Sequence, residues 1–175
     1  MLDGAARVDE MVAAAAADGQ PAMAITDHGV LYGVVDFTKA ALAAGVKPIL
    51  GIEAYVTAGS RFDRLPRRED KRYHLTLLAE NNAGYQNLMK LASRAYLEGF
   101  YYKPRMDSEL LSEHSEGIIA ASGCLGGHVA QLLAPDEASE EGNIGQVRDY
   151  AAAVEAAAMY QDIFGKDNWF IEVQD

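Results

Sequence analysis

The chain has 175 residues, a length typical of one domain, and half of them are hydrophobic, so it can bury a substantial core. Its 26 acidic and 15 basic side chains give a formal net charge of −11, which excludes a domain that holds nucleic acid through bulk charge. A single cysteine excludes an internal disulfide and fits a reducing, cytoplasmic compartment. No apolar run approaches the ~20 residues of a membrane span, and the opening MLDGAARVDE lacks a signal-peptide pattern.

The hydrophobic period switches repeatedly between that of helices and that of strands. In chain order, it predicts a helix over 5–17, a strand over 22–26, a helix over 34–44, strands over 49–56 and 74–79, a helix over 83–98, a strand over 117–122, helices over 127–133 and 144–164, and a strand over 169–173. This alternation predicts a mainly parallel α/β sheet, open or closed into a barrel. The strands are too few for a complete eightfold barrel, and the last has nothing to cover it, so we expect a fragment.

Two segments interrupt this alternation. Residues 60–72 contain six basic and three acidic side chains, which favours a solvated surface loop, with occasional phosphate contact as the alternative. Residues 135–143 are acidic and rich in small side chains, which is typical of an exposed linker.

Side chains that can bind metals or act in catalysis lie near several predicted strand ends, where functional groups gather in parallel α/β folds. Asp27 and His28 follow the first predicted strand, and Cys124 follows the strand that ends at Ser122. Glu53 is an acid inside an otherwise apolar strand. The rule does not select His74, because this histidine begins its strand.

Each candidate also has a purely structural explanation. His28 fits a hydrogen-bonded turn histidine, Glu53 a solvent-facing strand position, and Cys124 a small buried hydrophobe. His74 fits a strand edge, and Asp3 fits the N-cap of the first predicted helix. The two other histidines of the chain lie in polar surroundings and are expected at the surface.

Imidazole, carboxylate and thiolate groups that meet at one mouth of a sheet are the ligands of a transition-metal site. They favour Zn²⁺, Mn²⁺ or Fe²⁺ over a pure Mg²⁺ or Ca²⁺ cage. A carboxylate that bridges two ions, with a bridging hydroxide, is a known arrangement for in-line attack on a phosphoester. The sequence contains no Walker A loop, dinucleotide-binding glycine fingerprint or nucleophile-elbow serine.

Four stretches together resemble one family: ITDHG (25–29), KPILGIEAYV (47–56), RYHLTLLAENNAGYQNLMKLAS (72–93) and EGIIAASGCLGG (116–127). They are similar to the PHP (polymerase and histidinol phosphatase) domain of bacterial DNA polymerase III alpha subunits, and the resemblance covers nearly the whole chain. It implies a distorted seven-stranded (β/α) barrel with a cleft for two or three divalent metal ions.

The resemblance implies nine metal ligands, and five of them fall on this chain: Asp3, His28, Glu53, His74 and Cys124. The family's opening His-x-His and closing Asp-x-His motifs do not occur in the sequence. We therefore expect residues 1–175 to be a partial PHP domain, truncated at both ends. Incomplete coordination predicts weak metal binding and little activity of this piece alone, and open sheet edges predict poor solubility.

The function that the resemblance implies for the parent protein is DNA-directed DNA polymerisation in replication. Its PHP domain is expected to be a metal-dependent 3′–5′ exonuclease or phosphoesterase, with His28 and Glu53 as catalytic residues and Glu53 bridging ions. The implied partners are DNA and other replicase subunits, including a proofreading exonuclease; no membrane is implied. Two alternatives remain open: a non-catalytic scaffold domain that stabilises the polymerase and docks a proofreading subunit, and a free-standing PHP-family phosphatase.

Overall fold

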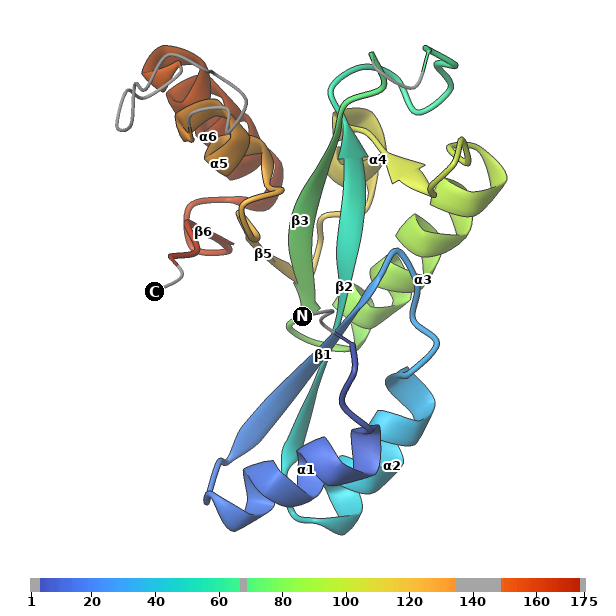
Figure 1. Cartoon of the computed structure of the whole chain (residues 1–175), viewed down its shortest axis with the longest axis vertical. Helices are drawn as coiled ribbons and strands as arrows, with labels where there is room; N and C mark the ends of the chain where they lie inside the picture. Colours follow the sequence, from blue (N-terminus) through green and yellow to red (C-terminus); the bar gives the residue numbers. More distant parts are fainter. Residues whose placement is uncertain (1–3, 67–68, 135–148, 174–175) are drawn as a thin grey trace.

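The computed structural model describes residues 4–66, 69–134 and 149–173 of the chain (Figure 1). These ranges contain six helices: α1 (Val8–Ala17), α2 (Val34–Ala43), α3 (Asn82–Leu97), α4 (Ser108–Glu113), α5 (His128–Leu133) and α6 (Tyr150–Phe164). They also contain six strands: β1 (Ala22–His28), β2 (Lys47–Thr57), β3 (Arg72–Ala79), β4 (Arg105–Met106), β5 (Ile118–Ala121) and β6 (Trp169–Phe170).

The strands form one mixed sheet in the order β1-β2-β3-β5-β6, with β4 beside β2. Strand β3 is antiparallel to both of its neighbours, and every other pairing is parallel. Within the described ranges, all strands except β3 therefore run in one direction, as the predicted mainly parallel sheet requires. The sheet is compatible with part of a (β/α) barrel, and the expected count of seven strands stays a prediction.

The two faces of this sheet differ sharply in polarity. Side chains alternate between faces along a strand, and one face is apolar and buried, with no more than 3% exposure at Ile52, Ala54, Val56, Leu75 and Leu77. Residues of α3, α4 and α6 pack against this face to form the larger core. Helices α1 and α2 cover the part of the sheet near β1, at the lower end of Figure 1. There Phe37 of α2 and Ile25 of β1 belong to a second buried cluster. The opposite face is left for polar side chains.

Helix α3 is fixed to the start of β5 by a close glycine contact. A Cβ atom on Gly84 would overlap the carbonyl oxygen of Gly117, which itself has a left-handed φ of 70°. The Asn81 side chain caps the helix by accepting from the Gly84 N–H, and Asn87 donates to the Glu116 carbonyl. These contacts set the position of β5, the strand that leads to Cys124.

Arg61 belongs to the β2–β3 connection (residues 58–71), and its burial shows that the prediction of a solvated loop is wrong there. Only 3% of Arg61 is exposed, and its guanidinium pairs with Asp107 at 2.9 Å, Glu109 at 2.8 Å and Glu98 at 2.7 Å. Burial lowers the pKa of Arg61, but hydrogen bonds to these acids more than offset it, so that pKa is raised. The sequence pattern shows charge but not which charges pair internally.

Arg105 closes the same connection from the other side. It is fully buried in β4 and donates to Asp70 Oδ1 at 2.7 Å and to the Arg61, Asp63 and Gly99 carbonyls. Neither β4 nor α4 is predicted from the sequence, because a two-residue strand and a six-residue helix are too short to establish a period. The connection that joins β2 to β3 is therefore clamped to β4 and α3.

Other predicted elements agree with the structure apart from their ends. Strand β1 continues through Asp27 and His28, where the sequence predicts a turn, because pairing with β2 extends it; Gly29, with φ 69°, makes the turn. Residues 135–143, the predicted linker, and 144–148, the predicted start of the last helix, lie outside the described residues. None of the described helices is long and apolar enough to cross a membrane.

Candidate metal centre

Two histidines flank one carboxylate on the polar face of the sheet. His28 is the last residue of β1 and lies directly opposite Glu53 of β2 in the strand register. Its Nδ1 is 2.9 Å from Glu53 Oε2, while the Nδ1 of His74 is 2.7 Å from the other oxygen, Oε1. The carboxylate therefore presents one oxygen to each imidazole.

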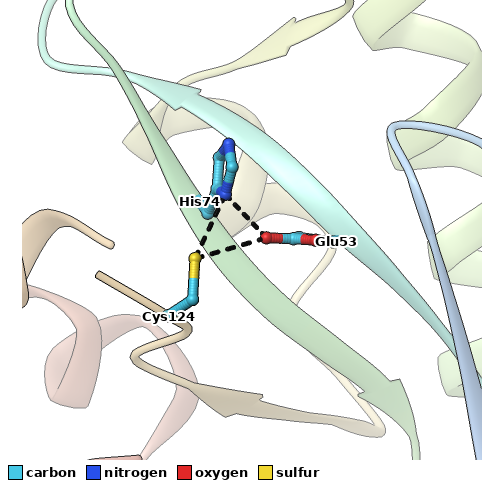
Figure 2. Close-up of side chains that lie close together, drawn as sticks. All are labelled: Glu53, His74 and Cys124. Atoms are coloured by element: carbon cyan, nitrogen blue, oxygen red, sulfur yellow. Dashed lines mark hydrogen bonds and ion pairs between the residues drawn. The ribbon is translucent and has the colours of Figure 1, made fainter. Parts of the chain in front are cut away.

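A thiol completes the cluster around Glu53 Oε1. Cys124 follows β5, and its Sγ lies 3.4 Å from His74 Nδ1 and 3.8 Å from Glu53 Oε1. Figure 2 shows these three side chains converging from β2, β3 and the segment after β5. One ligand atom from each lies within 4.8 Å of the others, which is close enough to hold a single metal ion. The Gly126 N–H donates to the sulfur at 3.3 Å and so fixes the Cys124 side chain beside the cluster.

The reversal of β3 explains why His74 belongs to this cluster although it lies near the start of its strand. Because β3 is antiparallel to β2 and β5, its first residues lie beside the last residues of those strands. His74 pairs with Tyr55, two residues beyond Glu53, and so reaches the mouth where β1, β2 and β5 end. A rule based only on C-terminal strand ends misses such a residue.

The cluster is accessible to solvent and to a ligand. The side chains of His28, His74 and Glu53 are 38%, 28% and 15% exposed. The Tyr55 ring lies beside the two imidazoles, 6.4 Å from the His28 ring and 5.4 Å from the His74 ring, while the imidazoles are 5.8 Å apart. The site is thus a partly open polar mouth with one aromatic wall.

The donor set fits a transition metal. Nitrogen, oxygen and sulfur donors together match Zn²⁺, Mn²⁺ or Fe²⁺ better than Ca²⁺ or Mg²⁺, which prefer oxygen alone. One ion could be held among Glu53 Oε1, His74 and Cys124, and the other carboxylate oxygen of Glu53 faces His28. Asp3 lies outside the described residues.

Three other residues that the sequence brings to attention lie elsewhere. Asp27 accepts from the Gly33 N–H at 2.8 Å and holds the start of α2, on the core side of the sheet. His128 is not a surface residue as predicted, because its ring stacks 4.0 Å from Tyr73 and burial lowers its pKa. His114 is half-buried beside Arg94, and its pKa is lowered first by burial and then by that cation.

Sequence reasoning misses the role of Gly126. A Cβ atom there would lie 3.0 Å from His74 Nδ1, so this glycine keeps the edge of the imidazole open. The only available signal is the glycine pair in GCLGG, which does not by itself reveal what lies opposite.

An α/β sheet that gathers a carboxylate, two imidazoles and a thiol at one mouth defines a candidate metallohydrolase centre. The PHP domain family matches residues 1–175, and the chain belongs to this family. Relatives named DNA polymerase III subunit alpha are 47% identical in Treponema pallidum (strain Nichols) and 47% identical in Thermus aquaticus, each over 100% of this chain. A protein of the same name in Mycobacterium tuberculosis is 42% identical, also over 100% of the chain.

The chain spans 14% of the length of the Treponema and Thermus relatives. The matched region is therefore a small part of those proteins, and the family identity concerns this domain.

Proposed function

We propose that this chain is part of the PHP domain of a DNA polymerase III alpha subunit and that the His28–Glu53–His74–Cys124 cluster is a metal-dependent phosphoesterase centre. Its substrate would be the terminal phosphodiester at a 3′ end of DNA, so the reaction is removal of a 3′ nucleotide. The observation that carries the proposal is the Glu53 carboxylate, with one oxygen at His28 and the other at His74 and Cys124.

Each side chain has a distinct part in this proposal. His28, Glu53, His74 and Cys124 would hold the ions, with Glu53 as the carboxylate between the two imidazoles, and Asp3 is a further ligand that only the family resemblance implies. Two or three ions of Zn²⁺, Mn²⁺ or Fe²⁺ would supply a hydroxide nucleophile at neutral pH and neutralise charge on the phosphoryl group. The Gly126 N–H positions the Cys124 sulfur, and Tyr55 limits the room beside the imidazoles.

The activity proposed for the whole protein is DNA-directed DNA polymerisation, with DNA and other replicase subunits as partners. The names of the relatives and the full coverage of this chain support it. The same names disfavour a free-standing phosphatase.

The test compares Glu53→Gln with a Glu116→Gln control in the full-length protein. The first removes the bridging charge, whereas Glu116 is an exposed residue away from the cluster. We expect Glu53→Gln to lower bound metal, measured by plasma mass spectrometry, and to slow 3′ nucleotide release by about 100-fold or more. The control should change neither quantity. Normal metal content and normal nuclease activity in Glu53→Gln would overturn the proposal.

A non-catalytic scaffold is the second candidate, and exposed apolar side chains favour it. Tyr32 is 82% exposed and Leu97 is 86% exposed, and both border a groove of about 530 Å³ along α3. Replacing His28 with alanine in the full-length protein separates the two candidates. Lost nuclease with an intact fold supports catalysis, whereas an unfolded domain together with an inactive wild type supports the scaffold.

A further inference from the structure

A pocket of about 440 Å³ adjoins the candidate metal centre at His74. It is lined by residues 71–74 at the start of β3, by Gly126, and by Gln131 and Leu132 of α5. This volume lies within the range typical of small-ligand sites. Because His74 contributes both to this pocket and to the cluster with Glu53 and Cys124, a molecule in the pocket would lie next to any group held at the cluster.

The pocket is cationic in a strongly acidic chain. Lys71 and Arg72 contribute its two formal charges, and no acidic residue is among its described lining residues, although the chain carries −11 overall. Other cations of the same connection are used internally, since Arg61 pairs with three acids and Arg64 donates to the Glu98 carbonyl. Arg72 lies 3.5 Å from the buried Asp70 carboxylate, but no acid of the described residues pairs with the Lys71 ammonium, so internal pairing leaves the charge of Lys71 unexplained.

The position of Arg72 is set by its strand and by one carboxylate. Arg72 and His74 are two residues apart on β3, so their side chains leave the same face with Cα atoms about 7 Å apart. Asp70 Oδ2 lies 3.5 Å from Nε of Arg72 and attracts the guanidinium without a hydrogen bond, while Oδ1 accepts from Arg105 at 2.7 Å. The terminal nitrogens of Arg72 then remain as the fork that suits a phosphate.

Gly126 keeps the passage between the pocket and the imidazole open. The backbone carbonyl of Gly126 accepts from the His74 N–H at 2.9 Å, which fixes the glycine against the strand. A Cβ atom at this position would come within 3.0 Å of His74 Nδ1. Any larger residue would therefore fill the space between the two sites.

We propose that this pocket binds a second phosphate group of the substrate through Lys71 and Arg72, beside the phosphoester at the metal-ligand cluster. This proposal rests on the proposed phosphoesterase function, and it explains how an acidic domain recognises an anionic substrate locally. Arg72 and His74 leave the same face of β3, so a phosphate at Arg72 would lie beside a phosphoester at the cluster. The pocket would thus hold the nucleotide next to the one that is released.

The first test is a lysine-acylation footprint of the full-length protein in EDTA, so that neither metal nor activity is needed. Mass spectrometry follows acylation of Lys71 and of Lys47, an exposed control at the other end of β2. We expect a single-stranded oligonucleotide with a 3′ hydroxyl to slow modification of Lys71 by about fivefold or more and to leave Lys47 unchanged. Unchanged modification of Lys71 would overturn the proposal. Inorganic phosphate forms a separate arm, and protection by phosphate without protection by DNA identifies a free-phosphate site and also overturns it.

The second test uses Lys71→Glu, with Lys47→Glu as the matched charge reversal. We expect Lys71→Glu to raise KM for 3′ nucleotide release about tenfold at low salt, with kcat within about twofold and with unchanged metal content. The difference should shrink as salt screens the charge. Equal effects of both reversals contradict a local pocket. Gly126→Ala should abolish the Lys71 footprint without changing any charge. If Glu53→Gln disproves the nuclease, the footprint still reports on the pocket, so the two failures are distinguishable.

Discussion

Replacing Arg105 with methionine tests whether the β2–β3 connection is held by a buried charge. Arg105 is fully buried, and its partner Asp70 has a side chain only 1% exposed. Methionine keeps much of the volume but removes every donor, so Asp70 Oδ1 and the Arg61, Asp63 and Gly99 carbonyls lose their guanidinium.

The expected cost follows from the carboxylate that remains. Asp70 Oδ2 is buried and accepts no hydrogen bond from the described residues, and the nearest cation, Arg72, pairs with it only at 3.5 Å. Breaking a buried ion pair by removing one partner costs about 3–5 kcal/mol. Because every 1.4 kcal/mol is tenfold in an equilibrium constant, local opening should become about 140- to 3,700-fold more frequent.

Hydrogen–deuterium exchange of peptides from residues 58–71 measures this opening in the full-length protein. The Arg61 amide is the best single reporter, because it donates to buried Asp107 at 2.8 Å. Peptides from α1, on the far part of the sheet, serve as the internal control. The double variant Arg105→Met/Asp70→Asn should recover much of the protection, since it removes the orphaned charge as well.

If the exchange rate at residues 58–71 changes less than tenfold in a protein that remains folded, the Arg105 hydrogen bonds do not hold the connection in place. The same conclusion follows if the double variant is less protected than Arg105→Met. Because the connection joins the strands that carry Glu53 and His74, a real loss of the clamp should also weaken metal retention.

Two further predictions concern packing and pH. Gly84→Ala places a Cβ atom against the Gly117 carbonyl and should destabilise the chain by about 3 kcal/mol or more. The control Gly59→Ala should cost far less, because its Cβ atom meets only the flexible Asp63 carboxylate. Comparable losses of soluble yield and unfolding midpoint in the two variants would contradict this reasoning. Burial lowers the pKa of His128 below its usual 6.5. As pH falls below 6.5, the unfolded chain therefore binds more protons than the folded chain, and the folded chain loses stability down to the lowered pKa. His128→Phe should remove this loss, measured by the fluorescence of Trp169, the one tryptophan of the chain; an unchanged pH slope would show that His128 is not its source.

The candidate centre was partly predictable because its residues lie in distinctive local sequence. His28, Glu53 and Cys124 are chemically unusual residues at or near the ends of apolar strands, and the family motifs add His74 and Asp3. Element order was predictable for the same reason, since hydrophobic period is a local property of five to fifteen residues. The short elements β4 and α4 carry no such signal.

Sequence alone determined the order of the main helices and strands, the residue types of the candidate centre and the local excess of charge before β3. Only the tertiary structure decided which of these groups meet. The reversal of β3 brings His74 to the mouth, and burial sends Arg61 and Arg105 into internal pairs while Lys71 and Arg72 line a pocket. The physical reason is that strand direction and charge pairing both depend on contacts distant in sequence: Tyr55 pairs with His74 across the reversed strands, and the charge contacts Arg61–Asp107 and Arg105–Asp70 join residues 46 and 35 positions apart, which no local pattern encodes.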